Sequence, residues 1–347
     1  MRSHKVVQVF CFTITLACFV GASEHPIASY PVESMGDMMP RWDEANHRVL
    51  SYQLQTSAEQ VAVQITSIDR SEPTVKINVL KDFPGAVKAV LVGVASGADQ
   101  SIVVACRIVY PKHSQAGALK ELILMYDSTG RLTKVWDVAP YEPSAISSDE
   151  GGNIYSFGMR FDAHPPADYG TLVEYSPDGK IVSEMLAASL FPAAVDPTEY
   201  STETGPGVLK VFHDRIYVYA ARLSEIFVLD RSGNVVNRYK VQSFFRDLAA
   251  RNHYAARALI EVAFDGEGNL YFDLGLSEPV IKGIPNSARI GGKLNPASLQ
   301  SAQWPFPREV AGKEIMVDRR MIGVTADGSV VSQVRARGEF RVEITGR

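Results

Sequence analysis

Residues 258–273 read ALIEVAFDGEGNLYFD, and this stretch decides the fold. The even positions from Ile260 to Phe264 carry large apolar side chains and alternate with Glu261 and a small residue, which is the period-2 pattern of a β-strand. Asp265 begins a turn rich in Gly and Asn, and glycine supplies the positive φ angles that such turns need. A Leu-Tyr-Phe run then resumes as a strand, so the stretch predicts a β-hairpin.

The hairpin pattern recurs along the chain, at residues 90–104, 144–158, 208–220 and 321–334. A second set of Asp/Gly turns lies between these hairpins, at 127–130, 176–179 and 230–233. One repeat is therefore a four-stranded antiparallel unit of roughly 50–60 residues. Repetition of such a unit without helical periodicity is typical of a β-propeller. The sequence predicts an all-β fold, a single β-propeller with six four-stranded blades or, as the second choice, five.

The chain divides into three predicted parts. Residues 1–22 have the pattern of a signal peptide, residues 23–50 read as a linker or surface arm, and residues 51–347 form the propeller domain. Repeats are expected at 86–138, 142–187, 207–241, 258–299 and 317–345. The last repeat has only three strands, so we expect N-terminal strands to complete it, because ring closure hides exposed sheet edges. Alternatively, the early strands form a blade of their own.

The N-terminus predicts export. A basic start with Arg2 and Lys5 precedes an apolar run at 6–20, and small residues follow. The run is shorter than the ~20 residues that span a bilayer, so we expect cleavage and no remaining transmembrane segment. The residues before Cys18 resemble a bacterial lipoprotein box, which makes a lipid anchor on Cys18 the alternative. With the expected cleavage of residues 1–22, Cys106 would be the one cysteine of the mature chain, without an internal disulfide.

Charge and motifs exclude several classes of function. The formal net charge is -4 and the pI is about 6.0, which argues against a nucleic-acid partner. The chain contains no G-x-S-x-G elbow, P-loop, H-E-x-x-H or paired CxxC motif.

The lengths of the connections between strands predict which face of the propeller carries the functional site. Turns within the hairpins are short, and in a propeller they share one face. The connections expected on the other face are long: 110–118, 159–170, 187–206, 242–257, 274–288 and 300–316. Long loops on a rigid scaffold commonly carry binding or catalysis, so we expect the site on the long-loop face.

Arginines and carboxylates expected near that face are candidates for ligand binding. Residues 243–257 predict a helix that carries arginines, and further charged residues enter the last repeat. Arginine binds carboxylates and phosphates through paired hydrogen bonds, although these groups could equally form ordinary surface ion pairs. The candidates are Arg246, Arg257, Glu261, Asp318 and Arg320.

The segment 161–169 is the candidate for a metal or an acid/base pair. It contains Asp162 and His164, side chains that ligate hard or borderline cations. The alternative interpretation is a solvated loop stiffened by its two prolines.

The hairpins VAFDGEGNLYF and ISSDEGGNIYSF resemble the NHL-type and six-bladed TolB-like β-propellers, which carry a D-x-x-G-N-[IL]-Y turn between two strands. The resemblance covers most of 86–345 and implies the fold far more than the function. Its members include extracellular binding modules, lyases and calcium-dependent lactonases. The lactonase branch places an Asn ligand in an N-G-[LI]-A-[WF] context, whereas residues 260–264 and 143–146 of this chain contain no Asn.

Two functions follow as hypotheses. In the first, the chain is an exported binding or scaffold module that holds a peptide, a glycan or a small anion on its long-loop face. In the second, it is a metal-dependent hydrolase or lyase, lactonase-like, with a divalent cation such as calcium at the mouth of the central channel. The residues that could form the second site are Asp162, His164, His253, Glu261 and Asp318.

Overall fold

A computed structural model describes residues 26, 28–33, 38–57, 59–68, 72–111, 118–162, 165–166, 168–191, 208–212, 214–221, 223–305, 308–311, 314–336 and 338–346. Within these residues the fold is almost entirely β, as predicted, with one α-helix and three short 3-10 helices. The predicted signal peptide, including Cys18, lies outside them. No helix in this part of the chain is long and apolar enough to cross a bilayer.

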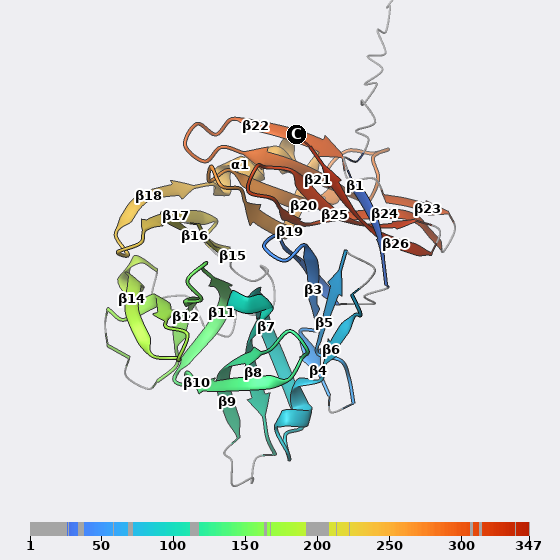
Figure 1. Ribbon diagram of the computed structural model, residues 1–347. Coiled ribbons are helices and arrows are strands. Elements are labelled where there is room, and N and C mark those ends of the chain that lie inside the picture. The colour runs from blue at the N-terminus through green and yellow to red at the C-terminus, as the bar shows by residue number, and fades with distance from the viewer. Residues whose placement is uncertain are drawn as a thin grey trace, which may run out of the picture.

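The described strands form six antiparallel sheets, which follow one another along the chain (Figure 1). The first sheet contains β2 (Met39–Asp43), β3 (Arg48–Tyr52), β5 (Val63–Ser67) and β6 (Val75–Ile77). The second contains β7 (Lys88–Ser96), β8 (Ile102–Val109), β9 (Leu119–Tyr126) and β10 (Leu132–Asp137), with β4 (Gln55–Thr56) beside β7. The 3-10 helices η1 (Val79–Asp82), η2 (Ala98–Gln100) and η3 (Ala188–Leu190) lie in connections.

The third and fourth sheets have four strands each. They are β11 (Tyr141–Ser148), β12 (Ile154–Arg160), β13 (Gly170–Tyr175) and β14 (Ile181–Ala187), then β15 (Val208–Val211), β16 (Arg215–Ala220), β17 (Glu225–Asp230) and β18 (Val235–Lys240). The fifth contains β19 (Tyr254–Phe264), β20 (Leu270–Pro279), β21 (Ser287–Leu294) and β22 (Ser301–Pro305). The sixth contains β23 (Arg308–Ala311), β24 (Glu314–Val324), β25 (Val330–Ala336), β26 (Glu339–Thr345) and β1 (Ala28–Val32).

The sheets are arranged in a closed ring. The innermost strands are β2, β7, β11, β15, β19 and β24, and each contacts the next, with β24 returning to β2. Sheets that radiate from a common centre in this way, with their inner edges protected by neighbouring sheets, are the architecture of a β-propeller. The predicted repeats agree with the observed sheets, and the fifth sheet extends beyond its predicted range, from Tyr254 to Pro305.

The segment 23–50 differs from the prediction of a linker or surface arm. Its described residues include β1, β2 and the beginning of β3, so the propeller begins before residue 51. β1 pairs with β26 from Ala28–Ile344 to Val32–Phe340, so an N-terminal strand completes the last sheet, but it comes from the segment that was interpreted as a linker. The early strands β5 and β6, after residue 50, lie in the first sheet, which is the alternative that the sequence left open. β1 and β2 are edge strands and each contains a proline, a residue that lacks the N–H of a sheet ladder. Prolines and short length hid the strand pattern in the sequence.

The turn in the stretch 258–273 forms as predicted. Phe264 pairs with Leu270 across the hairpin of β19 and β20. The Asp265 carboxylate accepts hydrogen bonds from the backbone N–H of Glu267 at 3.0 Å and from that of Asn269 at 2.9 Å. Gly268 has a φ of 79°, which a residue with a Cβ adopts at a cost. The turn therefore needs its Asp and its Gly.

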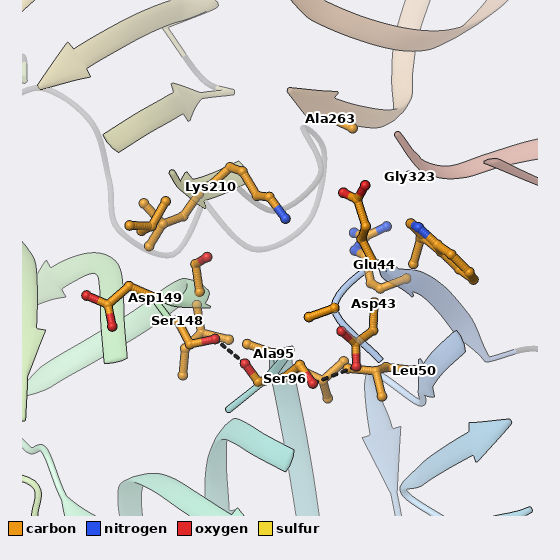
Figure 2. A pocket seen from close by; sticks show the side chains of 18 of the residues that line it. Asp43, Glu44, Leu50, Ala95, Ser96, Ser148, Asp149, Lys210, Ala263 and Gly323 are labelled. Carbon is orange, nitrogen blue, oxygen red and sulfur yellow. Dashed lines mark hydrogen bonds between the residues drawn. The ribbon is translucent and has the colours of Figure 1, made fainter. Parts of the chain in front are cut away.

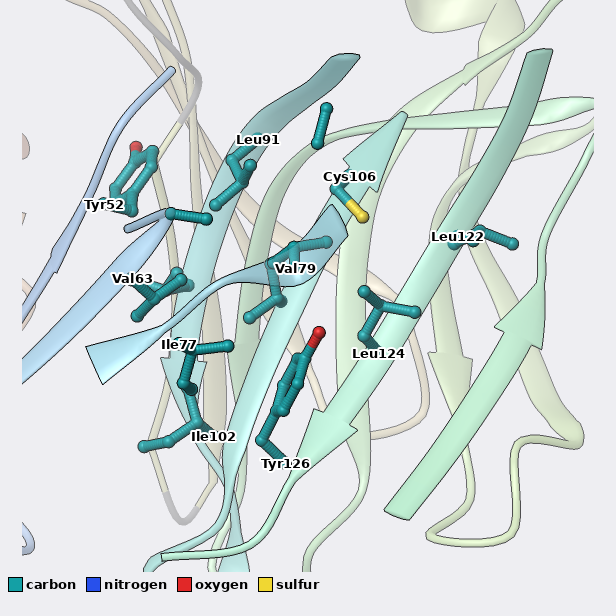
Figure 3. Close-up of a cluster of buried hydrophobic side chains, with 14 of the residues drawn as sticks. Tyr52, Val63, Ile77, Val79, Leu91, Ile102, Cys106, Leu122, Leu124 and Tyr126 are labelled. Carbon is teal, nitrogen blue, oxygen red and sulfur yellow. The ribbon is translucent and has the colours of Figure 1, made fainter. Parts of the chain in front are cut away.

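Apolar side chains fill the space between neighbouring sheets. Figure 3 shows the cluster between the first two sheets, in which Tyr52, Leu91, Ile102 and Tyr126 are almost fully buried. Cys106 belongs to this cluster, and burial raises the pKa of its thiol. The thiol is therefore a small apolar core group, as expected for a cysteine inside a strand.

The helix α1 (Gln242–Arg251) is shorter than the predicted helix at 243–257, because β19 begins at Tyr254. Its apolar side is buried as expected, through Phe244, Phe245 and Leu248. Arg257 consequently lies on a strand, and does not share a helical surface with Arg246.

Candidate ligand-binding cavity

A cavity of about 920 Å³ lies at the centre of the ring. All six innermost strands line it, together with the turn that follows each of them (Figure 2). The lining turn residues are Glu44, Ala45, Asn46, Gly97, Asp99, Gln100, Asp149, Glu150, Gly151, Phe212, Asp214, Gly266 and Ala326. These are the short turns, so the cavity lies toward the face opposite the one that was predicted to carry the site. A volume of this size is within the range of small-molecule sites.

One end of the lining holds a buried ion pair. The guanidinium of Arg41, on β2, donates from Nη1 to Oε2 of Glu261, on β19. Burial raises the pKa of the Glu261 carboxyl, and Arg41 partly opposes that shift. Arg320, on β24, adds a second positive charge near this pair, and burial lowers the pKa of its guanidinium. The pair joins the first sheet to the fifth.

Asp43 holds the turn between β2 and β3. Its Oδ2 accepts hydrogen bonds from Arg48 Nε at 2.6 Å, from Asn46 Nδ2 at 3.0 Å and from Ser96 Oγ at 2.5 Å. Figure 2 shows the contact with Ser96, which comes from the neighbouring sheet. With three donors on one oxygen, Asp43 has a structural role at the cavity wall.

Glu44 is fixed across the ring opening in a different way. The backbone N–H of Ala326, in the turn after β24, donates to both of its carboxylate oxygens at 2.9 Å. A carboxylate has about four acceptor positions, so Glu44 keeps capacity for a further donor. Asp149 lies on the opposite wall. Its two carboxylate oxygens accept hydrogen bonds from Arg231 and Asn153, so neither oxygen is without a donor.

Lys210 brings an amino group into the cavity. It lies on β15, and Figure 2 shows its side chain reaching across the cavity toward the side where Asp43 and Glu44 lie. Among the residues that the structure describes, no carboxylate lies within ion-pair distance of its Nζ; the Phe212 ring centroid lies 5.6 Å away. Burial lowers the pKa of Lys210, and the carboxylates of Glu44 and Asp43 oppose the shift without cancelling it.

The structure separates most of the site residues predicted from the sequence. Glu261 lines the cavity, and Arg320 lies close enough to it to interact electrostatically. Asp318 lies 3.3 Å from Arg289, away from the cavity lining. Arg246 faces solvent beside its neighbour Asp247, and Arg257 does not line the cavity. Arg246 and Arg257 therefore do not contribute to the cavity.

The predicted metal segment is described only in part. Asp162 Oδ2 accepts from Arg160 Nη2 at 2.6 Å, which is an ordinary ion pair, and His164 lies outside the described residues. Within the described ranges, no group of three or more His, Cys, Asp or Glu side chains could hold a metal ion. His253 and Asp318 also do not join Glu261 at the cavity. The hydrolase or lyase hypothesis therefore has no metal-binding group in this part of the chain to support it.

The sequence analysis missed Lys210, Asp43 and Glu44. Lys210 stands in the run VLKVF at 208–212, which was correctly expected to be the first strand of a repeat. A charged residue on an innermost strand was the available signal. Asp43 and Glu44 were in the segment that was interpreted as a linker.

No family model matches the chain, and no curated protein matches it. Among solved structures, a candidate exported protein of Bacteroides fragilis is similar with 11% identity and a TM-score of 0.46, over 88% of this chain and 83% of that one. A DUF4221 family member from Bacteroides vulgatus has 8% identity and a TM-score of 0.43, over 92% and 95%. The C-terminal WD40 domain of Sif2 has 10% identity and a TM-score of 0.40, over 93% and 98%. Similarity at this level carries no information on function.

The ring of sheets and its central cavity define the class: a β-propeller with a central cavity that charged side chains help to line.

Proposed function

We propose that the chain is an exported, six-bladed β-propeller that binds a small polar ligand in its central cavity. Each of the six sheets is taken as one blade, and the N-terminal residues 1–22 as the export signal. The NHL-like turn motif is compatible with this assignment. The observation that carries the proposal is Lys210, a half-buried cation aimed into a cavity of about 920 Å³ without an ion-pair partner among the described residues.

The charges of the cavity select among the ligand classes that the sequence suggested. Glu44, Asp99 and Asp214 line the same cavity as Lys210, so a simple anion that met Lys210 would also meet nearby carboxylates. These carboxylates would repel a negatively charged ligand, so the cavity disfavours a small anion. A ligand with several hydroxyl groups and one hydrogen-bond acceptor suits this cavity better than an anion does. Its hydroxyl groups can donate to the carboxylates, and its acceptor can take a hydrogen bond from Lys210. This favours a sugar or polyol over a peptide or a small anion.

The proposal is tested by thermal denaturation and isothermal titration calorimetry of the mature chain. The probes are ribitol, ribose and maltose, with inorganic phosphate as the anionic comparison. A probe at 100 times its Kd stabilises the folded state by about 2.7 kcal/mol, which raises the Tm of a chain of this size by several degrees.

Variants locate the binding site. Lys210→Met should weaken binding of the hydroxylated probe about tenfold, because one hydrogen bond to a charged group is lost. Lys180→Met is the matched control, since Lys180 is exposed and pairs with Asp178 outside the cavity. Binding that is unchanged in Lys210→Met, or no binding by any probe at millimolar concentration, would contradict the proposal.

A further inference from the structure

Lys210 offers a chemical property beyond hydrogen bonding, because a primary amine is a nucleophile when it has no proton. Its side chain comes from an innermost strand and ends inside the cavity, where a bound ligand would lie against it (Figure 2). Salt-bridged lysines are held as ammonium ions by their partner. Lys210 has no such partner within the described residues, and Phe212 supplies an aromatic neighbour.

The surroundings of Lys210 favour its neutral amine form more than water would. Burial lowers the pKa of Lys210, and the opposing effects of Glu44 and Asp43 are smaller. Lys180 shows the opposite behaviour: its hydrogen bond with Asp178 raises its pKa. The chain therefore contains an activated amine in the cavity and a non-activated amine on the surface for comparison.

A carboxylate is available to move protons beside Lys210. Glu44 lines the same cavity and interacts electrostatically with the lysine. Its orientation is fixed by the N–H of Ala326, while part of its acceptor capacity stays open. Asp43 is less suited to this role, because Arg48, Asn46 and Ser96 already donate to it.

Resting on the proposed binding function, we infer that the ligand is a small hydroxylated aldehyde or ketone, and that Lys210 captures its carbonyl carbon reversibly as an imine. The Lys210 nitrogen donates its electron pair to the carbonyl carbon, and a C–N bond forms while the C=O π pair moves to oxygen. A proton passes from nitrogen to that oxygen, which gives a carbinolamine. The C–O bond then breaks, and the oxygen leaves as water once it has received a second proton.

The overall step is balanced without any additional reagent. Amine plus carbonyl compound give imine plus water, with no change of oxidation state. Glu44 lies beyond ion-pair distance of Nζ, so it accepts the proton that nitrogen loses, and returns a proton to the departing oxygen, through one bridging water molecule. The hydroxyl groups of the ligand donate hydrogen bonds to the carboxylates that line the cavity, while its carbonyl group reacts with Lys210.

Reductive trapping tests this inference on the mature chain. The protein is incubated with glyceraldehyde and sodium cyanoborohydride, which converts an imine into a stable secondary amine, and adducts are mapped by peptide mass spectrometry. We expect Lys210 to be labelled several-fold faster than Lys180, because the cavity holds the carbonyl group of a bound ligand against Lys210, whereas Lys180 lies outside the cavity. Excess ribitol, a polyol without a carbonyl, should slow the labelling of Lys210 and leave Lys180 unchanged.

Variants separate the chemistry from folding and from simple binding. Lys210→Arg keeps a cation and should remove the fast adduct, while its Tm stays near that of the parent protein. Glu44→Gln should slow adduct formation several-fold and leave ribitol binding weakened but present. If ribitol binds in a Lys210-dependent way and Lys210 is labelled no faster than Lys180, the inference is wrong and the binding function stands. If neither ribitol binding nor fast labelling is found, both are wrong.

Discussion

Replacing Asp265 with alanine tests whether the hairpin turn that repeats along this chain is held by its carboxylate. Asp265 is 1% exposed and accepts from the backbone N–H groups of Glu267 and Asn269 and from Asn269 Nδ2, at 2.9–3.0 Å. Lys293 Nζ lies 3.3 Å from the same carboxylate. Alanine would leave the backbone N–H of the buried Asn269 without this acceptor, while its Nδ2 would keep only the hydrogen bond to Glu267 Oε2 at 3.2 Å.

The magnitude follows from these contacts. A hydrogen bond to a charged group contributes about 1.5–3 kcal/mol, and neighbouring bonds do not add fully. We therefore expect Asp265→Ala to lower the free energy of unfolding by about 3 kcal/mol. With a urea m-value of about 3 kcal/mol/M, the midpoint of urea denaturation falls by about 1 M. Asp265→Asn keeps one acceptor oxygen and loses the charge, so its effect should be smaller.

A matched turn supplies the control. Asp230 accepts from Ser232 N, Asn234 N and Asn234 Nδ2 at 2.9–3.0 Å, the same set of bonds in a turn that faces solvent. Water can replace the carboxylate there, so Asp230→Ala should shift the midpoint clearly less than Asp265→Ala. Equal shifts for the two variants, measured by urea denaturation followed by circular dichroism, would refute the reasoning that burial sets the cost.

Three further predictions concern the cavity, a glycine and acid stability. Arg41→Met should lower the free energy of unfolding by about 3 kcal/mol, because the buried Glu261 carboxylate loses its partner, and the double variant with Glu261→Gln should recover part of that loss in urea denaturation. Gly268→Ala should cost about 2 kcal/mol, measured in the same way, because φ is 79° and the new Cβ would lie 2.6 Å from the ring of Tyr217. A stabilised Gly268→Ala variant would contradict this. A hydrogen bond from Thr129 lowers the pKa of Asp127 to about 2, below its unfolded value, so its contribution to stability is complete above pH 4 and is lost as the pH falls toward 2. Asp127→Asn should therefore flatten the fall of the urea midpoint between pH 5 and pH 2, and an unchanged fall would count against it.

Local chemistry made the sheets predictable. The run from Ile260 to Phe272 predicts two strands and a turn, because side-chain alternation and turn residues are local properties of the sequence. β1 and β2 were not predictable in this way, because each is short and contains a proline. The strand conformation of β1 depends on β26, a partner far along the chain, whereas β2 pairs with its neighbour β3.

The cavity was harder to predict for the same reason. Arg41 and Glu261 are 220 positions apart, and only closure of the ring brings them together. The position of Lys210 on a first strand was predictable, but its direction and the absence of a nearby ion-pair partner among the described residues depend on five other sheets. Loop length pointed to the face opposite the cavity, because long connections show where the chain carries insertions and not where the innermost strands leave space.

The pairing of β1 with β26 has a consequence for how the molecule is made. Chains are synthesised from the N-terminus, so β1 emerges first and its partner strand emerges among the last residues of the described chain. The sixth sheet therefore remains incomplete until β26 has been synthesised, and its last pairing has the long sequence separation that slows folding. Because β1 is only half-buried and sits at a sheet edge, its release is the natural first step of unfolding, and its amide hydrogens should exchange with solvent earlier than those of the interior strands.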